Sequence, residues 1–183
     1  MFIETETTPN PATLKFLPGR AVMAGGTANF TSAEAAGRSP LAQRLFEIEA
    51  VTGVFLGADF VTVTKDEAAD WYKLKPEILG AIMEHFTSGR PLLLHGEAPV
   101  PEAAAEEDGE VVSQIKELLE TRVRPAVAQD GGDIIFEAYA DGVVYLQMHG
   151  SCSGCPSSTA TLKAGIENML RHYIPEVVEV RAV

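Results

Sequence analysis

Cysteine is nearly absent from this 183-residue chain. There are only two, Cys152 and Cys155, and they lie within one short motif. So few cysteines exclude a disulfide-stapled scaffold and indicate a reducing compartment. The sequence also lacks an apolar run long enough to cross a bilayer. Its first residues show neither a secretory signal nor an arginine-rich transit peptide. We therefore expect a cytoplasmic chain with no membrane partner.

Basic residues are also scarce. Fourteen lysines and arginines are outnumbered by 26 aspartates and glutamates, which gives a formal net charge of −12. A surface without an excess of positive charge does not attract a phosphate backbone, so a nucleic-acid partner is not expected. The apolar fraction of 46% is ordinary for globular proteins, and the length allows one core or two.

An acidic segment rich in proline and alanine divides the chain. Residues 97–108 contain almost no bulky apolar side chain, which is typical of a linker. We therefore predict two small domains, residues 1–96 and residues 109–183. Both combine helical and strand-like patterns, so the predicted class is α+β.

The first domain shows no catalytic constellation. Prolines separate two short extended segments, a Ser39-Pro40 pair begins a helix, and a hairpin precedes a second helix. The predicted strands are residues 2–7, 13–17, 51–56 and 60–64, and the second helix covers about residues 74–87. We interpret His85 as a solvated helix residue. Trp71, Tyr72 and Phe86 are interpreted as core or interface residues rather than as a cofactor site.

The second domain is predicted to follow the order helix, strand, strand, helix, strand. Its first helix covers about residues 111–124 and ends at Pro125. The first two strands form a hairpin. The predicted strands are residues 134–139, 143–149 and 177–183.

The register of that hairpin depends on the length of its loop. A two-residue turn would place Glu137 on the face that carries Val144 and Leu146. A three-residue loop, Ala140-Asp141-Gly142 with a left-handed Gly142, aligns Ile134, Phe136 and Ala138 with this apolar face instead. We therefore predict the three-residue loop.

The two cysteines lie between a strand-like run and a helix-like run. A helix N-terminus favours negative charge, so we expect an exposed loop with stabilised thiolates. Thiolates at this spacing suit zinc, an iron–sulfur cluster or dithiol–disulfide exchange. A structural zinc or a [4Fe–4S] cluster normally takes four protein ligands, and His149 and His172 do not obviously complete the set. A symmetric dimer in which each chain gives Cys152 and Cys155 is the simple solution.

Several motifs accompany these cysteines. In the second domain they are Arg124-Pro125, Asp130-Gly131-Gly132-Asp133, Gly150-Ser151-Cys152-Ser153-Gly154-Cys155-Pro156-Ser157-Ser158 and Leu162-Lys163. In the first domain they are Thr8-Pro9-Asn10-Pro11-Ala12-Thr13-Leu14-Lys15-Phe16, Leu45-Phe46-Glu47-Ile48 and Leu74-Lys75-Pro76. With these motifs the chain resembles the NifU/Nfu family of iron–sulfur cluster scaffold and carrier proteins over nearly its whole length outside the linker.

The resemblance implies that Cys152 and Cys155 bind a [4Fe–4S] cluster shared between the two chains of a homodimer. It also implies transfer to apo iron–sulfur client proteins after loading by upstream cluster-assembly donors, without enzymatic turnover. Two other hypotheses stay open: a dithiol oxidoreductase that uses the same two cysteines, and a zinc-stapled dimeric interaction module.

Overall fold

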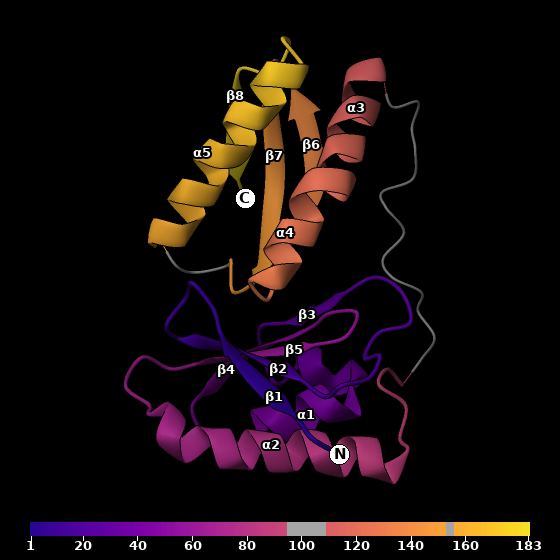
Figure 1. The fold of residues 1–183 in the computed structure, drawn as a ribbon, viewed down its shortest axis with the longest axis vertical. Coiled ribbons are helices and arrows are strands. Elements are labelled where there is room, and N and C mark those ends of the chain that lie inside the picture. Colours follow the sequence, from indigo (N-terminus) through magenta and orange to yellow (C-terminus); the bar gives the residue numbers. More distant parts are fainter. Residues whose placement is uncertain (95–108, 153–155) are drawn as a thin grey trace. The chain divides into compact units, whose positions relative to one another are not determined.

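A computed structural model of the chain describes residues 1–94, 109–152 and 156–183, with side chains for all of these except 156–158 (Figure 1). The chain divides into two compact units, Met1–Val100 and Pro101–Val183. Each unit contains helices and strands, which confirms the α+β class. The predicted linker, residues 97–108, lies outside the described residues. No described helix combines the length and the apolar character that a membrane span requires.

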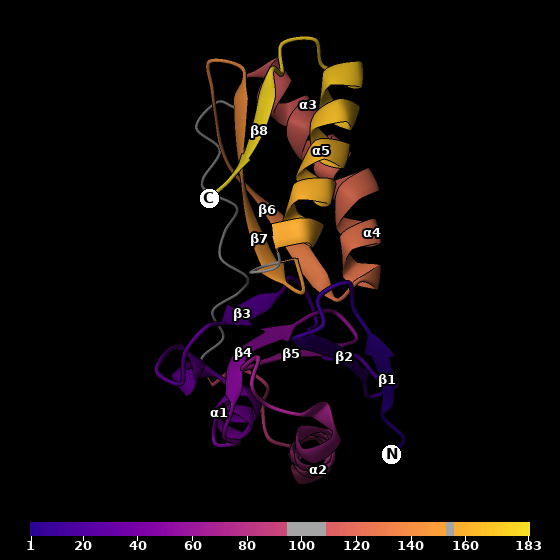
Figure 2. The ribbon, with the colours of Figure 1, turned by 90° about the vertical axis from the view of Figure 1, so that its left-hand side faces the viewer.

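The first unit is a five-stranded antiparallel sheet with two helices on one face (Figure 2). The strand order is β1-β2-β5-β4-β3. The strands are β1 (Glu4–Thr7), β2 (Thr13–Leu17), β3 (Ala28–Phe30), β4 (Val51–Leu56) and β5 (Val61–Lys65), and the helices are a 3-10 turn η1 (Ala35–Arg38), α1 (Pro40–Phe46) and α2 (Trp71–Ser88). Phe16, Phe30 and Leu41 are fully buried in the core of this unit.

Local signals fix the start of α1 and both ends of α2. The Ser39 hydroxyl accepts a hydrogen bond from the Ala42 N–H at 3.2 Å, so the predicted serine–proline start of α1 is confirmed. Helix α2 begins three residues before the predicted start, because Asp70 caps it by accepting the Tyr72 N–H at 2.9 Å. It ends at Gly89, whose φ of 68° is left-handed.

The prediction that His85 is solvated is wrong. This side chain is only 7% exposed, and its ring meets the Phe86 ring edge-on with centroids 5.3 Å apart. Burial, with a smaller contribution from Arg90, lowers the pKa of His85. Phe86 and Trp71 pack against the core as predicted, whereas Tyr72 is 87% exposed and is not a core residue. A pattern of helical spacing did not distinguish these outward and inward positions at the two ends of α2.

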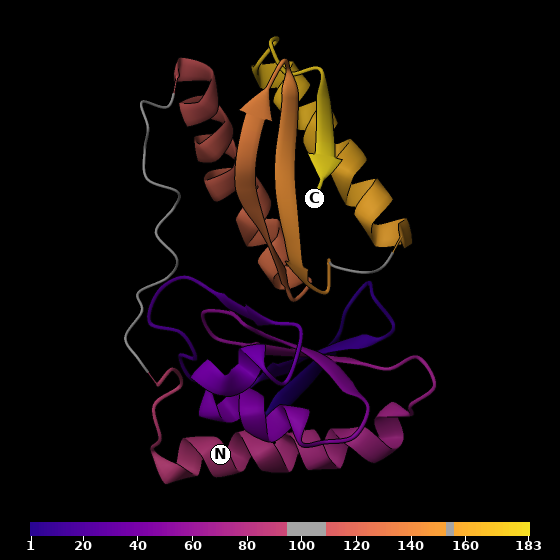
Figure 3. The same ribbon diagram turned by 180° about the vertical axis from the view of Figure 1, so that it is seen from behind.

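The second unit packs its helices on one face of a three-stranded sheet (Figure 2). The strands are β6 (Gly132–Ala140), β7 (Val143–Gly150) and β8 (Glu179–Ala182), and the helical segments are α3 (Glu110–Leu118), a π-helical turn η2 (Leu119–Val123), α4 (Arg124–Gln129) and α5 (Pro156–Tyr173). The order is β6-β7-β8, antiparallel and then parallel. Figure 3 shows the face of this sheet that points away from the helices, which lie behind it in that view.

Pro125 does not end the first helix of this unit, contrary to the prediction. The chain stays helical from Glu110 to Gln129, and Pro125 lies in the first turn of α4. The π turn makes this possible. The Arg124 N–H donates to the Leu119 carbonyl five residues back, and the widened turn accommodates a residue that has no N–H and would crowd the carbonyl four residues earlier.

The hairpin has a two-residue turn, contrary to our prediction of a three-residue loop. Ile134 and Phe136 nevertheless pair in the predicted register. Ala140 pairs with Val143, so the loop is the two-residue turn, with Asp141 and Gly142 at φ of 50° and 80°. A bulge between Phe136 and Ala138 inserts one extra residue, Glu137, which is exposed.

The bulge restores the apolar alignment. Ile134 pairs with Met148 and Phe136 pairs with Leu146, as the predicted register requires. Ala138, by contrast, is exposed, and Tyr139 lies opposite Val144 in its place. The loop length was therefore wrong, while the facing of Ile134 and Phe136 was right.

Candidate metal centre

Cys152 lies in the connection between β7 and α5. Strand β7 ends at Gly150, which has a left-handed φ of 66°, and α5 begins at Pro156. The predicted position of Cys152 between a strand and a helix is therefore confirmed. Cys155, its predicted partner, lies outside the described residues.

Cys152 is buried. Its exposed fraction is 6%, and it belongs to the apolar cluster of the second unit together with Ile134, Leu146 and Ile166. The thiol rests on the backbone of Gly132, where a Cβ would lie 2.8 Å from Sγ. Only a glycine at this position leaves room for the sulfur as it lies.

Burial raises the pKa of the Cys152 thiol to about 11. A hydrogen bond with Ser151 lowers the pKa, and the nearby charges of Asp130 and Asp133 raise it. The prediction of an exposed thiolate stabilised by the helix start is therefore wrong for Cys152. The cost of burying a charged sulfur is the largest cause of this shift, since desolvation disfavours the charged form of an acid.

Hydrogen bonds from both sides hold the segment around Cys152. The Ser151 N–H donates to the Gly131 carbonyl at 3.3 Å, and the Ser151 hydroxyl donates to the Asp130 carbonyl. From α5, the Thr159 hydroxyl donates to the Cys152 carbonyl at 3.0 Å. The turn at residues 130–132 and the start of α5 thus both position the cysteine.

An ion pair lies beside this turn. The Arg124 guanidinium makes two hydrogen bonds to the Asp133 carboxylate, Nε to Oδ1 at 2.9 Å and Nη2 to Oδ2 at 3.0 Å. Asp133 is 3% exposed, and its Oδ1 also accepts the Ile134 N–H at 2.8 Å. The Asp133 carboxylate and, more weakly, Glu120 raise the pKa of Arg124 despite its partial burial. The sequence motif had indicated only a turn here.

The histidines do not complete a metal site in the part of the chain that the structure describes. His149 is opposite Asp133 in the β6–β7 register, and its pKa is lowered mainly by burial, against the opposing charge of Asp133. His172 is exposed at the end of α5, where its ring meets Tyr173. Within the described ranges no three His, Cys, Asp or Glu side chains gather as a possible metal-ligand set. A metal at Cys152 therefore needs donors from beyond these side chains.

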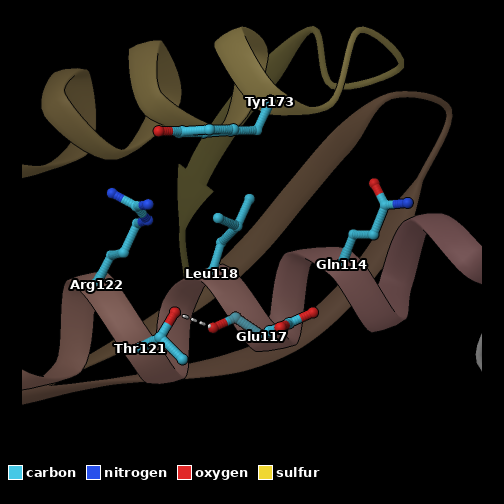
Figure 4. A pocket seen from close by; sticks show the side chains of 6 residues that line it. All are labelled: Gln114, Glu117, Leu118, Thr121, Arg122 and Tyr173. Carbon is cyan, nitrogen blue, oxygen red and sulfur yellow. Dashed lines mark hydrogen bonds between the residues drawn. The ribbon is translucent and has the colours of Figure 1, made fainter.

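A separate cavity of about 310 Å³ lies between the α3–η2 segment and the end of α5 (Figure 4). Arg122 places its guanidinium 5.1 Å from the centre of the Tyr173 ring, and the Thr121 hydroxyl donates to the Glu117 carbonyl at 2.7 Å. The lining residues are Gln114, Glu117, Leu118, Thr121, Arg122 and Tyr173. They include no thiol and no imidazole, so this cavity offers no soft metal ligand.

Comparison with known proteins identifies both units. Residues 3–89 match the model described as "Scaffold protein Nfu/NifU N terminal", and residues 115–181 match the "NifU-like domain". The chain is 55% identical over 184 residues to a human protein named "NFU1 iron-sulfur cluster scaffold homolog, mitochondrial", and it spans 72% of that protein. A protein of the same name from Drosophila willistoni is 53% identical, and the chain spans 64% of its length.

Among solved structures, the chain is similar to a NifU-like protein from Saccharomyces cerevisiae. The identity is 28%, the TM-score is 0.47, and the match covers 51% of this chain and 85% of that one.

The names of the relatives contradict the predicted cytoplasmic location, since both are described as mitochondrial. The scarcity of cysteine indicates a reducing compartment without distinguishing one such compartment from another. The resemblance to the family, by contrast, is confirmed. With both domain models matched in order and 55% identity to a relative that it covers by 72%, the chain belongs to the Nfu/NifU family.

Proposed function

We propose that this chain is an iron–sulfur cluster scaffold and carrier. Cys152 and Cys155 from each of two chains hold one [4Fe–4S] cluster across a homodimer, and the cluster is the cargo that is passed to apo-proteins. Upstream assembly proteins supply it. The chain itself performs no catalytic turnover.

The donor chemistry supports this proposal. Thiolates are the preferred protein ligands of iron–sulfur clusters, and a [4Fe–4S] cluster normally takes four of them. One chain has only two cysteines, so a second chain supplies the other pair. The single observation that carries the proposal is the position of Cys152, at a strand-to-helix connection in a NifU-like domain. The relatives named as cluster scaffolds agree with it.

The burial of Cys152 opposes the dithiol oxidoreductase hypothesis. Thiol–disulfide exchange requires an attacking thiolate, and reactive cysteines have lowered pKa values. A pKa of about 11 keeps the Cys152 thiol protonated at neutral pH. Iron can displace that proton on binding, because metals bind thiolates and release protons. Metal binding is therefore compatible with this environment, and spontaneous redox exchange is disfavoured.

The dimer is expected to depend on the cluster. Each chain carries a net charge of −12, so two chains repel one another at low ionic strength. The bridging cluster supplies attraction that the metal-free chains lack.

The test is anaerobic reconstitution of the full chain with iron and sulfide. Metal and sulfide analysis should find about four iron and four sulfide per two chains, which is the stoichiometry of one [4Fe–4S] cluster. The protein should also be brown. Size-exclusion chromatography should show a dimer that becomes a monomer when the cluster is removed. Zinc without sulfide would favour the zinc-stapled module, and a colourless protein with dithiol activity would favour the oxidoreductase. Cys152→Ser and Cys155→Ser should each abolish the chromophore.

We further propose that residues 109–183 carry the cluster and that residues 1–96 recruit donors or clients through the linker at 97–108. All the cysteines are in the second domain, and a tethered recruiting domain raises the effective concentration of a transfer partner. Comparing residues 109–183 with the full chain in cluster transfer to several apo-proteins tests this. Equal rates for every client would refute the recruiting role and leave the carrier function standing.

A further inference from the structure

Arg124 and Asp133 bind one another across the turn that supports Cys152. Both carboxylate oxygens of Asp133 are engaged by one guanidinium, at 2.9 and 3.0 Å. The Asp133 side chain is 4% exposed and that of Arg124 is 31% exposed. Such a two-bond fork fixes orientation as well as distance, which a single ion contact does not do.

The π turn before α4 places Arg124 in this position. Arg124 is the first residue after η2, and its N–H closes the π turn on Leu119. Its Nη1 also contacts Glu120 Oε2 at 2.5 Å. The guanidinium therefore joins three places: the π turn, the start of α4 and the start of β6.

The turn enclosed by this pair holds Cys152 directly. Residues 130–132 provide the carbonyls of Asp130 and Gly131 that bind Ser151, and the backbone of Gly132 on which Sγ rests. Asp133 follows immediately, at the point where β6 pairs with the end of β7. A shift of this turn would move the Gly132 backbone against which Cys152 Sγ packs.

We infer that the Arg124–Asp133 pair positions Cys152 for cluster binding by fixing the turn at residues 130–132. Both are positioning residues, and the cluster does not need to touch either of them. The inference rests on the proposed function, since it assigns the pair to the same cluster site. It goes beyond the two cysteines by naming what holds one of them in place.

A matched control exists in the same unit. On β8, Arg181 makes a similar fork to Glu179, with Nε to Oε1 at 3.1 Å and Nη2 to Oε2 at 3.3 Å. The Arg181 side chain is 54% exposed and that of Glu179 is 40% exposed, and β8 pairs with the far end of β7 from Cys152. Arg181→Gln therefore removes a forked ion pair without disturbing the turn.

The first measurement uses the metal-free full chain with Cys155→Ser, so that Cys152 is the only thiol. Its rate of alkylation by iodoacetamide reports how well the buried thiol is held. Arg124→Gln should raise this rate about tenfold or more, because opening of the turn exposes Sγ. Arg124→Lys keeps a positive charge for Asp133 but loses the fork, and its rate should lie between those of Arg124→Gln and the unchanged pair. Arg181→Gln should leave the rate unchanged.

The second measurement uses the chain with both cysteines after cluster reconstitution. The half-life of the cluster against an iron chelator should fall about 10- to 100-fold in Arg124→Gln, the range typical when a partner that orients a metal ligand is lost. Arg124→Lys should recover part of that loss. Circular dichroism checks that the variants are folded, and if Arg124→Gln does not fold, Arg124→Lys decides the outcome.

The two proposals fail in different ways. If the unchanged chain takes up no cluster, the proposed function is refuted, and the alkylation rates still decide whether the pair positions Cys152. If the chain binds a cluster but the folded Arg124 variants match Arg181→Gln in both alkylation rate and cluster half-life, the positioning role is refuted.

Discussion

Replacing Gly132 with alanine tests the close packing beneath Cys152. An added Cβ would lie 2.8 Å from Cys152 Sγ and 2.8 Å from the His149 carbonyl oxygen. The sulfur belongs to a side chain that can move, but the carbonyl belongs to the neighbouring strand β7. Gly132 is not in the left-handed region, so alanine is permitted by its backbone angles and the cost is one of contact alone.

Two opposing effects set how much Gly132→Ala changes the free energy of unfolding. Overpacking a well-packed site costs about 1–3 kcal/mol. Alanine also restricts the unfolded chain, which returns about 0.4–1 kcal/mol at a compatible site. We therefore expect Gly132→Ala to lower the free energy of unfolding of the second unit by about 1–2 kcal/mol. With a denaturant slope of about 1 kcal/mol per molar urea for a small domain, the midpoint moves down by about 1 to 2 M.

Gly165→Ala is the matched control. Gly165 lies within α5, and a Cβ there would meet no atom within 4 Å. Alanine should therefore stabilise the same unit by about 0.5–1 kcal/mol. Far-UV circular dichroism follows both units during urea unfolding, while fluorescence of Trp71, the single tryptophan, follows the first unit. If Gly132→Ala unfolds at the same or a higher urea concentration than the unchanged chain, the packing of Cys152 on this backbone is refuted.

Three further predictions concern other residues. Ser39→Ala removes the cap on the Ala42 N–H and should destabilise the first unit by about 1 kcal/mol, seen in the Trp71 transition; an unchanged midpoint would contradict the capping role. Alkylation of Cys152 in the metal-free Cys155→Ser chain should rise about tenfold per pH unit from pH 7 and level off only near pH 11, so a plateau below pH 9 would show that the thiol is not buried. Cys152→Ser should lose the cluster and also destabilise the second unit by about 1 kcal/mol, because a hydroxyl replaces a buried thiol; full iron and sulfide content in this variant would refute the ligand assignment.

Patterns of local chemistry predicted most of the strands and helix starts. The capping serine and proline at residues 39 and 40 and the glycine after α2 act through the nearest backbone groups, so their effects are readable from neighbouring residues. Four of the five strands of the first unit, β1, β2, β4 and β5, were predicted within one or two residues by β-branched and apolar runs, whereas β3 (Ala28–Phe30) was not predicted. The strand-like run before the cysteines and the helical spacing after them located the cysteine loop between β7 and α5.

Local backbone irregularities and contacts between distant segments were not predictable in the same way. Pro125 is a helix breaker by local rules, and the π turn before it accommodates the proline within a continuing helix. The bulge at Glu137 compensates for a turn that alone would reverse the faces of β6. The burial of Cys152 depends on Gly132, twenty residues earlier in the chain, and spacing within the cysteine motif carries no information about that contact.

The buried thiol gives the metal-free chain a definite dependence on pH. The pKa of Cys152 is about 11 in the folded chain against an ordinary value of 9.0, so the folded state keeps its proton where the unfolded state loses it. The second unit is therefore expected to lose stability as pH rises from about 9 to 11, and Cys152→Ser should remove that loss. The same burial keeps the thiol protonated at neutral pH, where thiol oxidation proceeds through the thiolate. If Cys152 binds the proposed cluster, binding releases this proton, so we expect cluster affinity to rise with pH. A Cys152 thiol that is unreactive without a metal and loses its proton only when a metal binds is better suited to the proposed cluster transport than to redox exchange.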